Sequence, residues 1–179
     1  SQVCGFLKSD PSRATPNLQF HVQPISTDIL GATKMHDFDG ITPTIANIRP
    51  TSRGEINIKS NDSRDNPKIK MNYLSTQEDR DVAAKSLKIV RKIMLETNAF
   101  KKYEPEEYRP GVHITDNEEL VQAGSEHTQT IFHPVGTCKM GNGDDSVVHE
   151  KLKVRGVENL RVIDASIMPN ITSGNTNAP

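Results

Sequence analysis

The sequence predicts an α+β fold in which an antiparallel sheet is covered on one face by helices. Residues 17–71 contain several short segments in which apolar and polar residues alternate, as expected for strands with one face in the core. A long segment with helical periodicity follows, and its apolar stripe can cover the sheet. Because brief turns rather than helices join the last three short segments, neighbouring strands are expected to run antiparallel.

The first strand is expected over Asn17–Ile25, where apolar and polar residues alternate. Pro24 ends this strand or places it at a sheet edge, because proline donates no backbone hydrogen bond. Three more strands are expected at Ile41–Ile48, Glu55–Lys59 and Pro67–Met71. Residues 27–40 show little periodicity and are interpreted as a loop near a substrate entrance. Short strands around a turn at Gly156 are expected over Leu152–Ile163.

The longest helix is expected over Ser75–Glu96. Ser75 and Glu78 have the spacing of a capping box, in which two side chains satisfy free N–H groups of the first turn. The apolar stripe of this helix consists of Ala83, Leu87, Val90 and Met94. A second capping pattern, Thr115 to Glu118, predicts a shorter helix that runs towards His127.

Composition is consistent with one domain or with one large part of a bigger protein. The 179 residues include 34% apolar and 4% aromatic residues, with no Trp, and the mean hydropathy is −0.60. Independent domains usually contain about 45–50% apolar residues with Gly counted, so we expect this chain to bury a face against a neighbour. A loop-rich but complete domain is the alternative.

Charge and cysteine usage argue against several functional classes. A net charge of −1 lacks the basic character that nucleic-acid binding requires. Cys4 and Cys138 are too few for a disulfide framework. No apolar run approaches the roughly 20 residues of a membrane-spanning helix, and no signal peptide is visible at Ser1. Because the chain starts without Met, we expect the natural N-terminus to lie further upstream.

Two polar residues stand out in the last third of the chain. His133 follows an apolar pair and precedes Pro134, and Asn175 lies between Gly174 and Thr176, where a turn is expected. The surrounding glycines and prolines suit a place where a flat, bulky ligand lies against the backbone. By itself the pattern indicates a site only weakly, because most isolated histidines are structural.

Three ordered motifs in this region resemble the C-terminal part of the glucose–methanol–choline (GMC) oxidoreductases. They are His133–Gly141, Leu152–Pro169 and Ser173–Pro179, and the similarity extends upstream through Arg49–Gly54 and Met71–Ser75. The resemblance covers most of the chain and implies a flavoenzyme that uses FAD to oxidise an alcohol. The motifs are most similar to those of family members that oxidise choline to betaine aldehyde, so choline is the first expected substrate.

The resemblance also assigns roles to individual residues. His133 is the expected base that takes the hydroxyl proton, and Asn175 is the expected group that fixes the substrate oxygen. An amide cannot act as a base at neutral pH, which favours His133 for that role. The residues that the resemblance places against the flavin are Asp164, Ala165, Thr176 and Asn177. A turn-forming or capping carboxylate is the structural alternative for Asp164.

One family feature is missing, because no Gly-x-Gly-x-x-Gly fingerprint for binding ADP occurs in the chain. The family carries that fingerprint near its N-terminus, so the chain is expected to be a C-terminal portion of a longer protein. Residues 1–130 are expected to form a substrate-binding domain, and residues 131–179 to carry the catalytic pair and the flavin-contacting segment. The portion by itself is expected to bind no FAD and to be inactive.

The expected partners are a small alcohol and the missing N-terminal FAD-binding half, without metal or nucleic acid. Self-association over an uncovered apolar face is a further expectation. A cytoplasmic location is expected, with membrane association through an electron acceptor as the alternative.

Two other functions compete with alcohol oxidation. His127, His133, Cys138 and His149 could form a metal site, but their separations of six, five and eleven residues match no compact zinc motif. A non-catalytic interaction domain descended from the family is the second alternative, and a full-length protein without bound flavin would favour it. Cys138 could act as a redox thiol, although a small buried hydrophobe is the simpler interpretation.

Overall fold

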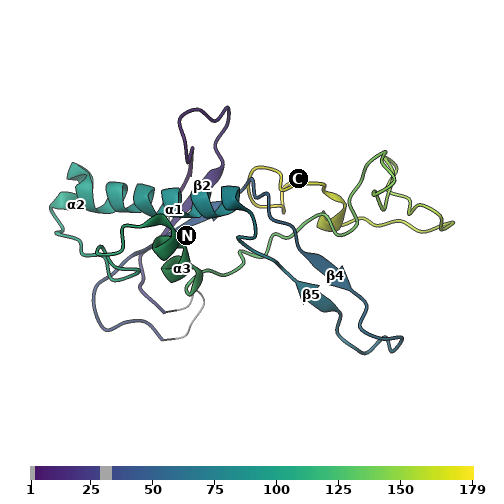
Figure 1. Cartoon of the computed structure of the whole chain (residues 1–179), viewed down its shortest axis with the longest axis horizontal. Helices are drawn as coiled ribbons and strands as arrows, with labels where there is room; N and C mark the ends of the chain where they lie inside the picture. Colours follow the sequence, from purple (N-terminus) through teal and green to yellow (C-terminus); the bar gives the residue numbers. More distant parts are fainter. Residues whose placement is uncertain (1–2, 29–33) are drawn as a thin grey trace. The chain divides into compact units, whose positions relative to one another are not determined.

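The computed structural model describes residues 3–28 and 34–179, which pack as two compact units (Figure 1). The first unit comprises Ser1–Pro50 and Thr76–Gln129, and the second comprises Thr51–Ser75 and Thr130–Pro179. Thr51–Ser75 therefore packs with the C-terminal residues, although the sequence-based division placed it in the first domain. The assignment of substrate binding and catalysis to the parts before and after residue 130 stays a prediction.

The first unit contains a three-stranded antiparallel sheet of β1 (Val3–Leu7), β2 (Leu18–Gln23) and β3 (Thr42–Asn47), in that spatial order. Leu18 is fully buried in the central strand, as its alternation predicted. β2 ends immediately before Pro24, and the edge position of β3 lets it accommodate Pro43, which cannot donate to a ladder.

Strand β1 was not predicted, because four of its five residues are apolar and show no alternation. The structure explains the pattern: Val3 and Phe6 of this edge strand are 57% and 50% exposed. Gln19 also departs from the expected alternation. It is buried in the central strand, where its side-chain nitrogen lies 3.6 Å from the Cys4 sulfur. The expected loop at residues 27–40 is partly outside the described residues, and its described ends contain no helix or strand.

Helix α1 (Gln77–Arg91) continues as one π-helical stretch at Lys92–Glu96 and is followed by the short α2 (Asn98–Lys101). The long helix is therefore confirmed, but its cap is one residue later than predicted. Thr76 is the cap, and its hydroxyl accepts from the Asp79 N–H at 3.3 Å.

The cap of α3 (Asn117–Ser125) differs from the prediction in the same way. The Asp116 carboxylate accepts from the N–H groups of Glu118 and Glu119, at 2.9 and 3.1 Å, so Asp116 replaces the predicted Thr115. Aspartate is a stronger capping residue than threonine, and its charge favours the positive end of the helix.

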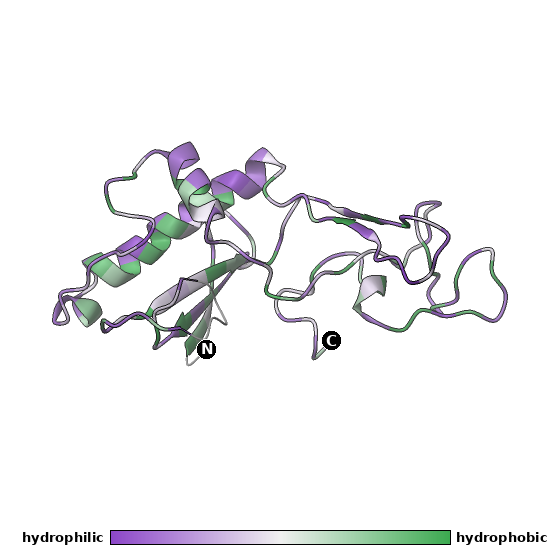
Figure 2. Cartoon of the chain, turned by 90° about the horizontal axis from the view of Figure 1, so that it is seen from below, coloured by the Kyte–Doolittle hydropathy of each residue, from purple (hydrophilic) through white to green (hydrophobic). Residues whose placement is uncertain are grey.

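The helices of this unit cover one face of the sheet, which confirms the predicted α+β class (Figure 2). Met94 of the predicted stripe is buried, while its other three members are only half-buried. Val82 and Ala84 are buried instead, because α1 packs against both the sheet and α3. The approach of α3 is close: a methyl group on Gly124 would lie 3.2 Å from the Leu87 side chain.

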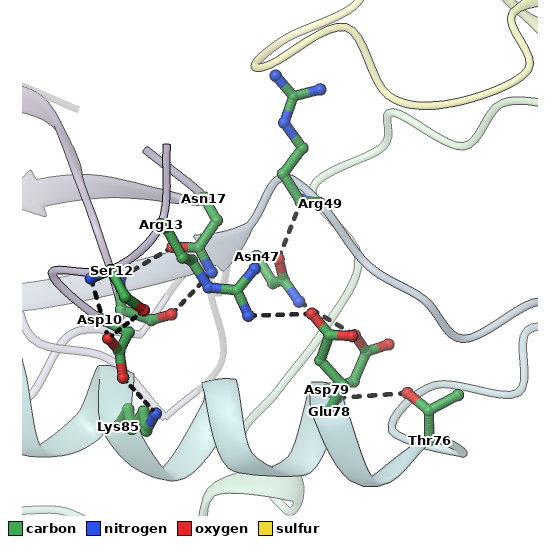
Figure 3. Close-up of polar contacts among 11 residues, drawn as sticks. Asp10, Ser12, Arg13, Asn17, Asn47, Arg49, Thr76, Glu78, Asp79 and Lys85 are labelled. Carbon is green, nitrogen blue, oxygen red and sulfur yellow. Dashed lines mark hydrogen bonds and ion pairs between the residues drawn. The ribbon is translucent and has the colours of Figure 1, made fainter. Parts of the chain in front are cut away.

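Polar contacts join the sheet and its first turn to α1 (Figure 3). Asp10 accepts from Lys85 at 3.0 Å, and Arg13 donates to Glu78 at 2.9 Å. The amide of Asn47, at the end of β3, donates to the buried Asp79 at 3.2 Å. These bonds fix the direction in which α1 crosses the sheet.

The second unit holds the antiparallel hairpin of β4 (Glu55–Asn57) and β5 (Lys68–Lys70). These are the predicted third and fourth strands, but they form a sheet of their own rather than extending the first one. Gly54 precedes β4 where the chains come close: a methyl group there would lie 2.7 Å from the Met71 carbonyl oxygen.

The rest of the second unit is mostly irregular and is held by isolated bridges. The expected strands at residues 152–163 are reduced to bridges that pair Val154 with Val148 and Lys153 with Arg161. Val148 is fully buried and anchors this region. Each helix within residues 3–28 and 34–179 is too short or too polar to traverse a lipid bilayer.

Candidate active site

His133 and Asn175 meet in the second unit, although 42 residues separate them in the sequence. The side-chain nitrogen of Asn175 lies 2.5 Å from Nε2 of His133. His133 is half-buried and Asn175 is exposed, so the pair lies at the surface of its unit. The structure thus brings together the two residues that the sequence singled out as a catalytic pair.

Thr176 contacts the other nitrogen of the same ring. Its hydroxyl oxygen lies 3.1 Å from Nδ1 of His133, and its backbone nitrogen lies 3.4 Å from that atom. Both ring nitrogens of His133 are therefore engaged by two consecutive residues of the C-terminal segment, and the ring plane is fixed between them.

Backbone hydrogen bonds hold the two segments of the site together. The N–H groups of Gly136 and Cys138 donate to the Ser166 carbonyl at 3.1 and 3.0 Å, and Met140 donates to the Ile167 carbonyl at 2.7 Å. Gly136 has a φ of +91°, which glycine adopts without the steric cost of a side chain. The turn after His133 is thereby fastened to the segment that leads to Asn175.

Asp164 organises the short 3₁₀ turn η2 (Ala165–Ile167). Its carboxylate accepts from the Ser166 N–H at 2.8 Å and from the Ser166 hydroxyl at 2.5 Å. The Ser166 hydroxyl, together with its backbone N–H, holds the pKa of the Asp164 carboxyl below its usual range. The capping role considered for Asp164 is therefore present, and it supports the carbonyls of Ser166 and Ile167 that bind the His133 segment.

The predicted flavin-contacting residues fall into two groups. Asp164 and Ala165 lie at the 3₁₀ turn, and the carbonyls of Ser166 and Ile167 accept the backbone hydrogen bonds from the His133 segment. Thr176 contacts His133, and Asn177 is exposed two residues beyond Asn175. Their role towards a flavin stays a prediction.

Sequence reasoning missed two backbone features of the site. Phe132, directly before His133, has a φ of +63°, and Ser173, two residues before Asn175, has a φ of +72°. Residues other than glycine rarely adopt this conformation, and such strain gathers at functional sites. Phe132 is also 77% exposed. Neither residue type signals a positive φ, so no pattern in the sequence could have revealed them.

Arg53 is a further residue whose place was not foreseen. Its guanidinium donates to the Asn170 side chain at 2.9 Å, and its carbonyl accepts from Asn72 at 2.9 Å. Arg53 thus ties the segment before β4 to the approach to Asn175. The only earlier indication was the similarity of Arg49–Gly54 to the family.

The competing metal site finds no support in the geometry. Within the part of the chain that the structure describes, no three His, Cys, Asp or Glu side chains are placed to share a metal ion.

Comparison with known proteins points to one family. The family model for the C-terminal domain of GMC oxidoreductases matches residues 50–179. An alcohol dehydrogenase [acceptor] of Pseudomonas putida is 45% identical over 98% of this chain, and an oxygen-dependent choline dehydrogenase of Proteus mirabilis is 41% identical over 97%. In both cases the chain spans only 31% of the relative's length.

Solved structures agree in fold. Pyridoxine 4-oxidase from Mesorbium loti superimposes with a TM-score of 0.82 and 26% identity, over 96% of this chain and 34% of that enzyme. A formate oxidase of Aspergillus oryzae, studied for modification of its FAD, gives a TM-score of 0.80 and 25% identity over 90% of this chain and 29% of its own.

Proposed function

Because the chain belongs to the GMC oxidoreductase family, we propose that it is the catalytic C-terminal region of an FAD-dependent enzyme that oxidises a primary alcohol. The main observation behind this proposal is the His133–Asn175 contact, which places a titratable ring nitrogen next to an amide nitrogen at the surface of the unit. Alcohol oxidation requires two such groups, because the hydroxyl proton must leave while negative charge develops on oxygen.

The two side chains have complementary tasks towards an alcohol. When the alcohol hydroxyl replaces the direct contact between the two side chains, its oxygen accepts from the Asn175 amide and its proton passes to Nε2 of His133. The amide then stabilises the developing alkoxide, and the ring holds the proton. The exposure of Asn175 leaves room for the alcohol to approach from the surface of this unit.

The residues around the pair fit a flavin. Asn175 and Asn177 present exposed amides, and Thr176 lies between them. We propose that Thr176–Asn177 and Asp164–Ala165 hold the ring system and its phosphates through backbone N–H and side-chain groups. When bound, FAD supplies the acceptor for the hydride that leaves the alcohol carbon.

Choline is the proposed substrate, giving betaine aldehyde as the product. Several relatives are named oxygen-dependent choline dehydrogenases, while another is an alcohol dehydrogenase, so charge is the property to test. Phe132 offers an exposed aromatic face next to His133, which suits a quaternary ammonium through cation–π attraction.

In the full-length enzyme, kcat/KM for choline is expected to exceed that for neutral primary alcohols of similar size by about tenfold or more, the worth of a desolvated cation–π contact. Steady-state kinetics with choline and its uncharged carbon isostere, 3,3-dimethylbutan-1-ol, would measure this. Preference for the uncharged alcohol would remove choline as the substrate and leave the reaction type standing.

The 179-residue chain alone is expected neither to hold FAD nor to oxidise alcohols, because it contains no glycine-rich phosphate cradle of the kind that binds dinucleotides. The hairpin β4–β5 supports this expectation. Ile56 and Ile69 pair across the hairpin and are 46% and 63% exposed, and Ile58, directly after β4, is 88% exposed, as expected where a neighbour normally packs. Flavin absorbance of the purified chain measures the outcome, and stoichiometric FAD would contradict it.

A further inference from the structure

Arg53 holds the C-terminal segment of the second unit at Asn170, five residues before Asn175. Its guanidinium donates through Nη2 to the Asn170 side-chain oxygen at 2.9 Å, although 117 residues separate the two in the sequence. Nη1 of the same guanidinium donates to the Ser52 carbonyl at 3.0 Å, so a second bond holds the planar fork. The segment that carries Asn175 is therefore fastened to the residues before β4.

The backbone of Arg53 is itself fixed by the hairpin of β4 and β5. The Asn72 side chain donates to the Arg53 carbonyl at 2.9 Å. One residue earlier, the Ser52 hydroxyl accepts from the Ser75 N–H at 3.0 Å. One residue later, a methyl group on Gly54 would lie 2.7 Å from the carbonyl oxygen of the residue directly after β5. The guanidinium thus extends from a backbone that is held on both sides, so its position determines the position of Asn170.

Between Asn170 and Asn175 the backbone is strained at Ser173, which has a φ of +72°. Such strain persists only where surrounding contacts hold the residue in place. Contacts of this kind lie on both sides of Ser173. Arg53 binds Asn170 before it, and Asn175 lies 2.5 Å from the His133 ring after it. Without the first contact, Ser173 can relax towards an ordinary φ, and Asn175 then moves relative to His133.

We propose that Arg53 is a positioning residue, which holds Asn170 so that the Asn175 amide stays next to Nε2 of His133. This inference rests on the proposed function, in which Asn175 fixes the alcohol oxygen and His133 takes its proton. A displaced amide would no longer reach the oxygen on which negative charge develops, and hydride transfer would slow. The His133 segment would stay in place, because its backbone hydrogen bonds go to carbonyls of η2.

Substitutions on both sides of the Arg53–Asn170 bond test this inference in the full-length enzyme. Arg53→Ala removes the donor and Asn170→Leu removes the acceptor. Each is expected to lower kcat by about tenfold, the low end for a hydrogen bond to a charged group, because both side chains are exposed. Asn170→Asp keeps an acceptor oxygen and should stay within about threefold of the parent. The control Arg64→Ala removes another exposed arginine, which binds Asp62 in the hairpin loop, and should leave kcat unchanged.

A double-mutant cycle with Asn175→Ala separates positioning from general damage to the fold. In the Asn175→Ala background, Arg53→Ala should have no further effect on kcat, because the amide that it positions is absent. An equal loss in both backgrounds, or a normal kcat of Arg53→Ala when Asn175→Ala is slow, would overturn the inference and leave the proposed function standing. Full activity of Asn175→Ala would refute the proposed role of Asn175, and the inference with it.

The position of the amide can also be observed without turnover. In ¹⁵N NMR of the full-length protein with labelled histidine, the Nε2 resonance of His133 is assigned by its absence in His133→Ala. Asn175→Ala removes the contact with Nε2 and should shift that resonance, and Arg53→Ala should shift it in the same direction. Arg64→Ala should leave it in place. An Nε2 resonance that stays at the parent position in Arg53→Ala would overturn the inference, whatever the kinetics show.

Discussion

Replacing His133 with Ala in the full-length enzyme is expected to reduce kcat by about 10²–10⁴-fold, the usual loss when a positioned proton acceptor is removed. The reason is chemical: without the ring, the hydroxyl proton has no acceptor while the hydride leaves. Asn175 cannot take over, because an amide is not basic at neutral pH. FAD content should change little, because the ring is half-buried and its hydrogen bonds go to Asn175 and Thr176.

The matched control is His127→Ala, which removes an exposed histidine two residues after the end of α3. It should leave kcat within about twofold, because surface substitutions away from special features have small effects. Stopped-flow reduction of the flavin by substrate would measure the chemical step directly. Near-normal reduction by the His133 variant at neutral pH would assign the base to another residue and would favour a non-catalytic role for this pair.

The class of fold was predictable because it depends on local patterns. Leu18 marks the central strand by alternation, and the helix from Gln77 follows from its periodicity. The division into two sheets was not predictable. Whether β4 extends the first sheet depends on packing between residues distant in the sequence, such as Gly54 against the backbone near Met71. Local periodicity contains no information about such packing.

The candidate site was predictable only as a pair of residues. The family resemblance identified His133 and Asn175 as the expected catalytic pair, whereas composition and spacing alone indicated a functional role for them only weakly. Their relation could not be predicted, since it depends on the backbone bonds from Gly136 and Cys138 to Ser166. The contact of Thr176 with Nδ1 needs the ring orientation as well, and no sequence pattern reports a side-chain rotation.

The most destabilising single substitution is expected at Arg91, at the C-terminal end of α1. Its guanidinium binds the Glu107 carboxylate through two bonds of 2.7 and 2.8 Å, and it donates to the carbonyls of Ile114 and Gly111 at 2.6 and 2.8 Å. The two side chains are only 15% and 10% exposed. One side chain thus satisfies a buried charge and two carbonyls of the loop between α2 and α3.

Arg91→Ala is expected to lower the free energy of unfolding by about 3–5 kcal/mol, because the buried Glu107 charge would lose its countercharge. It would keep the Gly111 N–H, which donates to it at 2.9 Å. Arg91→Lys keeps the charge but loses the planar fork, so its loss should be intermediate. Urea unfolding of the full-length protein, followed by far-UV circular dichroism, measures the change. Arg13→Ala is the control: its ion pair with Glu78 has the more exposed side chains, 31% and 48%, and such pairs contribute about 0–1 kcal/mol.

The loss of stability in Arg91→Ala is a different quantity from the net contribution of the Arg91–Glu107 ion pair to stability, and a double variant separates the two. The buried pair need not stabilise the fold relative to an apolar pair of similar size, because both charges lose their water. The free energy of unfolding of the double variant Arg91→Met with Glu107→Leu should therefore be closer to the parent value than that of Arg91→Ala. It should stay below the parent value, because the carbonyls of Ile114 and Gly111 lose a donor and the Gly111 N–H loses its acceptor. If Arg91→Ala were no less stable than Arg13→Ala, the loop would be held by contacts other than this guanidinium, and its bonds would be a consequence of the fold rather than a cause.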